Sequence, residues 1–186
     1  MFWPLMKDCI TQEDKNELVN FINTSNRYTN GPKVKEFEER WSEWLGVNHS
    51  LFVSSGSTAN LLLLSAMISR YNLKRGDKVL VPAMTWVTNV APIIQLGLKP
   101  VFCDVERRTL NTNSDYIKDK ITSRTKAVMV LHYGGVPCDL DGIMSLCKTN
   151  DLKLIEDNAN SPLSTYKNIH TGTIGDIGIW SFDAMK

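Results

Sequence analysis

From residue 49 onward, short apolar runs alternate with longer segments of helical periodicity. Short apolar runs bounded by polar residues are typical of buried strands. The predicted strands are His49–Ser55, Lys78–Ala83, Pro100–Val105, Lys126–His132, Lys153–Asp157 and Gly175–Phe182. The predicted helices between them are Ser57–Tyr71, a segment ending at Gln95, Ser114–Ile121 with Ser114 as N-cap, and Leu140–Asn150. This alternation predicts an α/β fold with a mostly parallel sheet that helices cover on both faces.

The first 46 residues follow a different pattern, with two predicted amphipathic helices joined by a polar turn. These helices are Gln12–Asn23, with a capping box from Thr11 and Asp14, and Lys33–Leu45. The second carries a single apolar stripe, which defines a buried face but not the surface that covers it. We therefore divide the chain into an N-terminal helical segment, residues 1–46, and an α/β portion, residues 47–186.

Composition narrows the classes of protein to which the chain can belong. The 186 residues include 21 Lys plus Arg and 20 Asp plus Glu, so the formal net charge is +1. This balance argues against nucleic-acid binding and against a polybasic membrane anchor, and no apolar run approaches the roughly 20 residues of a membrane span. The four cysteines form no CxxC pair. They predict reduced thiols in a cytoplasmic protein and neither a zinc site nor a disulfide framework.

Parallel α/β sheets bind ligands at the carboxyl ends of their strands, so the residues after each predicted strand are the candidates for chemistry. Segment 54–60 joins a predicted strand to a helix and carries Gly56, Ser57 and Thr58. Small residues, hydroxyls and free N–H groups at a helix start suit a phosphate, although an ordinary helix cap has the same composition. The chain has no GxGxxG or GxxxxGK sequence, which disfavours a nicotinamide-binding domain and a P-loop.

Three further residues lie at or just beyond the ends of predicted strands. Trp86 can stack on a flat ring or simply pack in the core. Asp157 can pair with a protonated ring nitrogen or cap a turn. Lys186 can act as a nucleophilic amine if it is desolvated, or it can be a solvated lysine. Together, a phosphate cradle, a stacking Trp, an Asp and a Schiff-base Lys are the parts that hold pyridoxal 5′-phosphate (PLP).

The order of these parts resembles that in the sugar aminotransferases of the DegT/DnrJ/EryC1/StrS family, and the resemblance covers nearly the whole chain. The matching segments are Gly31-Pro32-x-Val34-x-x-Phe37-Glu38, Ser55-Gly56-Ser57, Pro82-x-Met84-Thr85-Trp86, Pro100-Val101-Phe102-x-Asp104-Val105, His132-Tyr133-Gly134 with Pro137 and Asp139, Glu156-Asp157, Gly175-Asp176-Ile177 and Ser181-Phe182-x-x-x-Lys186. The resemblance implies the large domain of the aspartate-aminotransferase fold (PLP fold type I), with a C-terminal small domain absent from this chain.

The resemblance also implies a role for each matching residue. Lys186 would form the Schiff base and move the proton of the 1,3-prototropic shift, while Asp157 would keep the pyridine nitrogen protonated. Trp86 would stack on the ring. The phosphate would be bound by the segment containing Gly56, Ser57 and Thr58, with help from the Ser181 hydroxyl. Asn160 stands where the family usually has Gln or His near the ring hydroxyl, which is a departure from its pattern.

The implied reaction transfers an amino group, usually from glutamate, to a keto group of a nucleotide-linked deoxysugar, in a homodimer whose subunits complete each other's sites. Two alternatives remain. One branch of the family dehydrates the sugar at C-3 and carries His in place of Lys186. Two segments are similar to that branch, the Gly56-Ser57-x-Ala59-Asn60-Leu61 turn and Glu156-Asp157-Asn158. The other alternative is a truncated, catalytically inactive fragment that at most binds PLP, because family members continue beyond the lysine.

Overall fold

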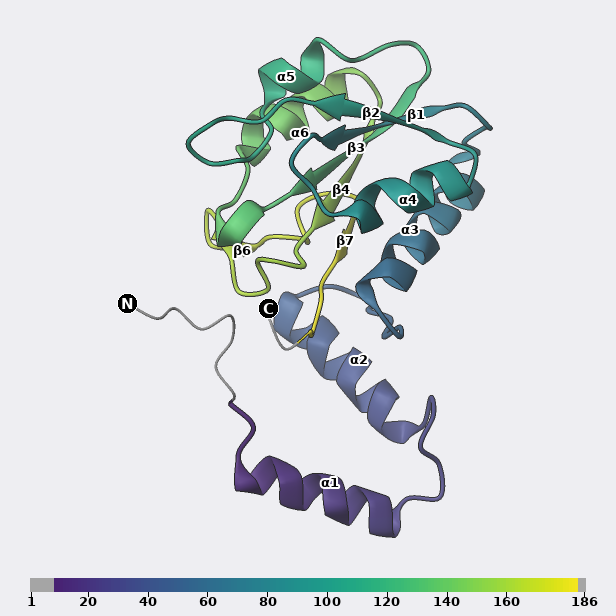
Figure 1. Cartoon of the computed structure of the whole chain (residues 1–186), viewed down its shortest axis with the longest axis vertical. Coiled ribbons are helices and arrows are strands. Elements are labelled where there is room, and N and C mark those ends of the chain that lie inside the picture. Colours follow the sequence, from purple (N-terminus) through teal and green to yellow (C-terminus); the bar gives the residue numbers. More distant parts are fainter. Residues whose placement is uncertain (1–8, 184–186) are drawn as a thin grey trace. The chain divides into compact units, whose positions relative to one another are not determined.

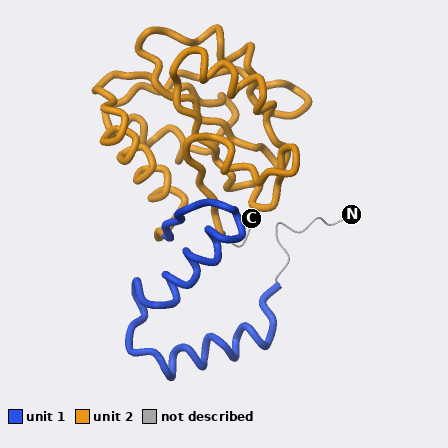
Figure 2. Tube along the Cα trace, turned by 180° about the vertical axis from the view of Figure 1, so that it is seen from behind, with its two compact units in different colours: residues 1–52, 183–185 blue, residues 53–182, 186 orange. Residues whose placement is uncertain are grey.

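The structure is a computed structural model that describes residues 9–183, and it divides the chain into two compact units (Figures 1 and 2). The described part of the first unit comprises residues 9–52 and 183, and the second unit comprises residues 53–182. Lys186 lies outside the described residues. No helix among the described residues is long and apolar enough to cross a membrane.

The first unit contains the two predicted helices, α1 (Gln12–Thr24) and α2 (Pro32–Leu45). The capping box of α1 is present, because the Asp14 N–H donates to Thr11 Oγ1 at 3.2 Å and the Thr11 N–H donates to Asp14 Oδ2 at 2.7 Å. Gly46 ends α2 in the left-handed conformation, at φ 72°, which glycine adopts without steric cost. The predicted N-terminal helices are therefore confirmed.

The predicted strand His49–Ser55 is wrong. These residues form an irregular segment in which the side chain of Leu51 is 74% exposed and that of Phe52 is 50% exposed. The Phe52 N–H donates to Glu38 Oε1 at 2.8 Å and does not join a strand ladder. The Phe52 ring packs against Phe37 of α2, with 5.2 Å between the ring centroids. The apolar run thus serves contacts with α2 and contributes no strand to the sheet.

The second unit is built on a five-stranded sheet in the order β2-β1-β3-β4-β7, in which all neighbouring strands are parallel. These strands are β1 (Lys78–Pro82), β2 (Lys99–Cys103), β3 (Thr125–Leu131), β4 (Lys153–Asp157) and β7 (Ile177–Ile179). The predicted α/β class and parallel sheet are confirmed. A short antiparallel hairpin, β5 (Thr165–Tyr166) with β6 (Ile169–His170), was not predicted from the sequence.

Helices cover both faces of the sheet (Figure 1). On one face, α3 (Gly56–Tyr71) and α4 (Val87–Gln95) enclose a core that includes Leu64, Ile93 and Ile155. On the other face, α5 (Ser114–Lys118) and α6 (Leu140–Thr149) enclose a second core. The N-cap of α5 is Asn113, whose side chain accepts the Tyr116 N–H at 3.0 Å, so the prediction of Ser114 as the cap is wrong by one residue.

The alternation of side chains along β4 determines where its two terminal acids lie. Ile155 belongs to the core under α3 and α4, whereas Leu154 belongs to the core under α5 and α6. Successive strand residues point to opposite faces. Asp157 therefore points to the α3 and α4 face, and Glu156 points to the α5 and α6 face.

Candidate functional site

Asp157 is the last residue of β4, and its side chain is only 3% exposed. The Ala159 N–H donates to Asp157 Oδ1 at 2.8 Å, which fixes the orientation of the carboxylate in the loop that follows the strand. Burial raises the pKa of Asp157, while the hydrogen bond from Ala159 and the amide side chains of Asn89 and Asn60 lower it in part. The carboxyl end of the sheet thus holds one buried acid that is costly to ionise without a positive partner.

Two asparagines connect the first turns of α3 and α4 beside this carboxylate. Asn60 Nδ2 donates to Asn89 Oδ1 at 3.1 Å, and Asn89 Nδ2 donates to Thr85 Oγ1 at 2.9 Å. Both asparagine side chains are buried, and Asn60 Oδ1 has no hydrogen-bond partner. Sequence reasoning missed Asn89 as a functional residue, and the available signal was a polar amide within the apolar α4 segment.

The first turn of α3 is open to a ligand. Ser55 is the N-cap, accepting the Thr58 N–H at 3.2 Å, and its carbonyl accepts the Ala59 N–H at 3.0 Å. The N–H groups of Gly56 and Ser57 are therefore the helix donors left over from the cap. A Cβ atom added to Gly56 would meet nothing within 4 Å, so there is open space above the turn. Two amides at a positive helix end, with space above them, fit a phosphate group.

The hydroxyls of Ser57 and Thr58 differ in whether they are available to bind a phosphate. The Thr58 hydroxyl donates to the Ser55 carbonyl at 2.8 Å and accepts the Ser55 N–H at 3.0 Å, so the capping box already occupies it. The Ser57 side chain is exposed. Phosphate binding by the hydroxyls of Ser57 and Thr58 remains a prediction, and the geometry favours Ser57 for this role.

Trp86 stands at the N-cap position of α4, and its side chain is 72% exposed. A core role would bury most of an indole this large. Because Asn89, one turn along α4, reaches Asn60 of α3, the start of α4 is held next to the start of α3. An exposed flat ring at this position suits stacking on a ligand ring.

The comparisons with known proteins agree with this arrangement. The model of the DegT/DnrJ/EryC1/StrS aminotransferase family matches residues 8–186. The chain belongs to this family. It is 36% identical over 181 residues to GDP-4-keto-6-deoxy-D-mannose 3-dehydratase of Yersinia pseudotuberculosis, covering 96% of this chain and 46% of that protein. It is 40% identical over 158 residues to dTDP-4-dehydro-2,3,6-trideoxy-D-glucose 4-aminotransferase of Saccharopolyspora spinosa, covering 84% of this chain and 40% of that protein.

Solved structures show the same family likeness. The aminotransferase from Psychrobacter cryohalolentis superposes with a TM-score of 0.91 at 31% identity, covering all of this chain and 46% of that one. A structure of GDP-4-keto-6-deoxymannose-3-dehydratase with a trapped PLP-glutamate geminal diamine superposes with a TM-score of 0.88 at 32% identity, covering 94% of this chain and 45% of that one. The chain therefore spans less than half of the DegT-family proteins that it matches.

The residues of the site fit PLP, which the structure of GDP-4-keto-6-deoxymannose-3-dehydratase contains. The open turn at Gly56 suits its phosphate, the exposed Trp86 suits its ring, and the buried Asp157 suits its ring nitrogen. Asn160 is exposed in the loop after β4. Ser181 lies two residues beyond β7, whose Ile179 pairs in register with Asp157, so both lie at the carboxyl edge of the sheet. The predicted role of Lys186 falls outside the described residues.

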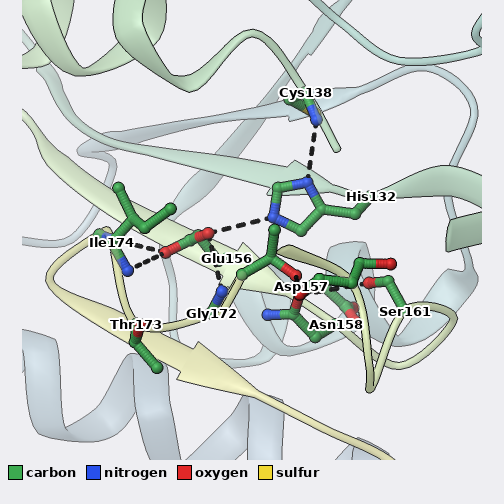
Figure 3. A network of polar contacts seen from close by, with 12 residues as sticks. His132, Cys138, Glu156, Asp157, Asn158, Ser161, Gly172, Thr173 and Ile174 are labelled. Atoms are coloured by element: carbon green, nitrogen blue, oxygen red, sulfur yellow. Dashed lines mark hydrogen bonds and ion pairs between the residues drawn. The ribbon is translucent and has the colours of Figure 1, made fainter. Parts of the chain in front are cut away.

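Next to Asp157 in sequence, Glu156 forms a buried contact with His132, and sequence reasoning assigned neither residue to the site. Glu156 and His132 are both fully buried, and His132 Nε2 lies 3.1 Å from Glu156 Oε2 (Figure 3). Desolvation acts to raise the pKa of Glu156, but the hydrogen bonds from His132, Gly172 and Gly175 outweigh it, so that the pKa is lowered. The acidic pair that ends β4 thus consists of two carboxyls whose pKa values are shifted in opposite directions.

Proposed function

We propose that the protein is a PLP-dependent aminotransferase that moves an amino group from an amino acid such as glutamate to a keto group of a nucleotide-linked deoxysugar. The observation that carries the proposal is the buried carboxylate of Asp157 at the carboxyl edge of the sheet, beside the open first turn of α3. The sequence supplies the amine of Lys186. The family's aminotransferases and dehydratases support the same substrate class.

Each residue contributes a separate physical effect. Asp157 binds the ring nitrogen as a proton-holding partner, which compensates for the cost of burying its own charge. Gly56 and Ser57 bind the phosphate through their N–H groups, and the helix dipole of α3 favours that negative charge. Trp86 covers one ring face and excludes water. When bound, PLP supplies a ring that withdraws electrons from the bond being broken at the substrate carbon.

Lys186 determines which reaction of the family we propose. An amine attacks a carbonyl carbon and moves a proton at Nζ, whereas an imidazole in the same position moves a proton without holding the cofactor covalently. The 36% identity to a 3-dehydratase, together with Asn60 in the α3 turn, favours sugar C-3 dehydration as the second candidate. The lysine favours amino transfer.

Product analysis separates these functions. The full-length protein with PLP, glutamate and a nucleotide-linked 4-keto-6-deoxysugar is expected to yield an amino sugar and one 2-oxoglutarate per product, measured by mass spectrometry. A ketone product that has lost the C-3 oxygen would establish dehydration instead. The 186-residue chain is assayed in the same way, and absence of any product from it, with PLP bound, would favour the inactive fragment as the third candidate.

The proposal includes a homodimer in the cytoplasm. Its support is the exposed apolar surface of α1, where the side chains of Leu18, Val19 and Ile22 are all more than half exposed. The four free cysteines suit a reducing compartment. Burial raises the pKa of the Cys103 thiol to about 11 and that of the Cys138 thiol to about 12, so these two thiols are poorly reactive. Sedimentation of the full-length protein at micromolar concentration tests the dimer.

Substitution of Trp86 tests the stacking role. Trp86→Ala is expected to weaken PLP retention about 2- to 10-fold, because an aromatic pair contributes about 0.5–1.5 kcal/mol beyond the area that it buries. Trp86→Phe keeps a flat ring and should change retention little, so it serves as the matched control. Equilibrium dialysis of PLP against the three proteins measures the difference, and equal retention in all three would remove Trp86 from the site.

A further inference from the structure

Glu156 is a fully buried carboxylate that contacts two separate segments of the second unit, His132 and the turn 172–175. Its Oε2 atom accepts the Gly172 N–H at 2.8 Å and lies 3.1 Å from His132 Nε2, directly after β3. Its Oε1 atom accepts the Ile174 N–H at 2.8 Å and the Gly175 N–H at 2.5 Å. All four contacts converge on one side chain at the end of β4, and Figure 3 shows those of His132, Gly172 and Ile174. We call this set of contacts the Glu156 clasp.

The geometry determines which atom of His132 carries the proton. The Cys138 N–H lies 3.1 Å from His132 Nδ1, and a backbone N–H can only donate, so Nδ1 accepts. His132 Nε2 therefore carries a hydrogen and donates to Glu156. All four partners of the carboxylate are donors, and this arrangement requires two acceptor oxygens. Only an ionised carboxylate satisfies every member of the clasp.

The clasp holds the turn 172–175 tightly against β4. A Cβ atom at Gly172 would lie 2.2 Å from Asn158 Nδ2, and the residue has φ 90°, so only glycine allows this approach. The Asp176 N–H donates to the Leu154 carbonyl at 2.9 Å, and the Asn158 N–H donates to the Ile179 carbonyl at 2.8 Å. The turn thus leads directly into β7, which pairs with β4 up to Asp157 and leads on to Ser181.

We propose that Glu156 is the positioning residue of the cofactor site, holding the turn 172–175 so that β7 delivers Ser181 at a fixed distance from Asp157. This inference rests on the proposed function only in taking Asp157 and Ser181 as groups that hold PLP. Glu156 faces the opposite side of the sheet from Asp157 and acts through the backbone of β4 and β7. A displacement of about 1 Å between cofactor-holding groups reduces turnover about 100-fold.

The matched pair Glu156→Gln and Glu106→Gln tests the clasp. In either rotamer, the glutamine at 156 places an NH₂ group against two donors, which loses two hydrogen bonds in a buried site. Glu106 is only partly buried, and it accepts Asn113 Nδ2 at 2.7 Å and Thr109 Oγ1 at 3.3 Å. A glutamine at 106 can keep both contacts, because a hydroxyl also accepts. The two variants therefore make the same chemical change inside and outside the clasp.

Hydrogen exchange and visible circular dichroism of bound PLP provide the measurements. In Glu156→Gln, the amide protection either of Gly172 or of both Ile174 and Gly175 is expected to fall about 100-fold, because the NH₂ group replaces the oxygen that accepts those hydrogen bonds. The visible dichroism of bound PLP is expected to fall with it, since that signal depends on a fixed ring orientation. Glu106→Gln should match the wild type in both measurements.

His132→Asn is a milder second variant, which keeps an acceptor near the Cys138 N–H and removes only the donor to Glu156. His132→Asn should lose less amide protection and less visible dichroism than Glu156→Gln. It replaces Glu156→Gln if that variant does not fold. Loss of amide protection with unchanged dichroism and unchanged turnover would overturn the positioning role, and so would unchanged protection. Failure of the proposed function is a different result, in which wild-type protein binds no PLP.

Discussion

Asp157→Asn in the full-length protein is expected to capture PLP and yet to lower transamination by about 100- to 1,000-fold, the size of effect seen when one electrostatic partner is removed from a reaction centre. The amide that replaces the carboxylate cannot hold a proton on the pyridine nitrogen as a negative charge does. Contacts with the phosphate and the ring face come from other residues, which explains the retained capture. Single-turnover kinetics and PLP titration measure the two effects separately.

The surface variant Asp119→Asn is the matched control for Asp157→Asn, because the Asp119 side chain is exposed in the same unit. The control should transaminate at the wild-type rate. Near-normal turnover in Asp157→Asn would remove Asp157 from the ring-nitrogen role. A loss of PLP capture comparable to the loss of turnover would show instead that this residue mainly builds the binding site.

The pH dependence of unfolding gives an independent measurement on Asp157 in the cofactor-free protein. Its pKa in the folded protein is raised above the ordinary value of 3.8, chiefly by burial. The contribution of such a carboxyl to stability is fully present below the unfolded pKa and is lost as the pH rises through the folded pKa. Between pH 4 and pH 7, Asp157→Asn should therefore lose less stability than the wild type, measured by urea unfolding.

Lys186→Ala is expected to abolish amino transfer, because no other group is proposed to attack the cofactor carbonyl or to move the proton at the reacting carbon. Borohydride treatment of the wild type with PLP should fix a label to the chain, and peptide mass mapping should locate it at Lys186. Lys186→Arg keeps a positive charge without a nucleophilic amine, so it should also be inactive. Lys148 is exposed, and Lys148→Ala is the control. This variant should take up the borohydride-fixed label and transfer the amino group as the wild type does.

Lys186→His is the variant that separates the two reactions of the family. We expect it to lose amino transfer and the borohydride label together, because an imidazole forms no reducible bond with PLP. Formation of a 3-deoxy ketone from the sugar substrate would show that the rest of the site already supports dehydration. Persistence of the amino-sugar product in Lys186→His would contradict the proposed role of the lysine.

The central strands could be predicted because each is marked by its own short run of apolar residues, without reference to distant parts of the chain. The strand Lys153–Asp157 is a short apolar run with polar boundaries, and β4 has the same bounds in the structure. The same reasoning fails at His49–Ser55, where the Phe52 ring packs against Phe37 of α2 and no residue enters the sheet. An apolar run thus predicts a contact surface, and its partner depends on tertiary structure.

The β5–β6 hairpin and the Glu156 clasp are two further features that could not be predicted from the sequence. Lys167 and Asn168 form the hairpin turn with φ values of 51° and 66°, although the glycine that usually marks such a turn is missing. Asp157 could be predicted from its place at the end of a strand. The partners of Glu156 lie 16 to 24 residues away in sequence, and neither spacing nor composition connects them.

The two outer strands of the sheet, β2 and β7, affect the route by which molecules of this protein aggregate. An unpaired strand edge can recruit a foreign chain through backbone pairing. β2 begins with Lys99 and Pro100, a charge and a residue without an N–H, and β7 is only three residues long. Within residues 9–183, both edges of this sheet are therefore poor templates for strand addition. Aggregation of destabilised variants should proceed through exposed apolar side chains such as Leu51 and Leu163, and mild detergents should suppress it.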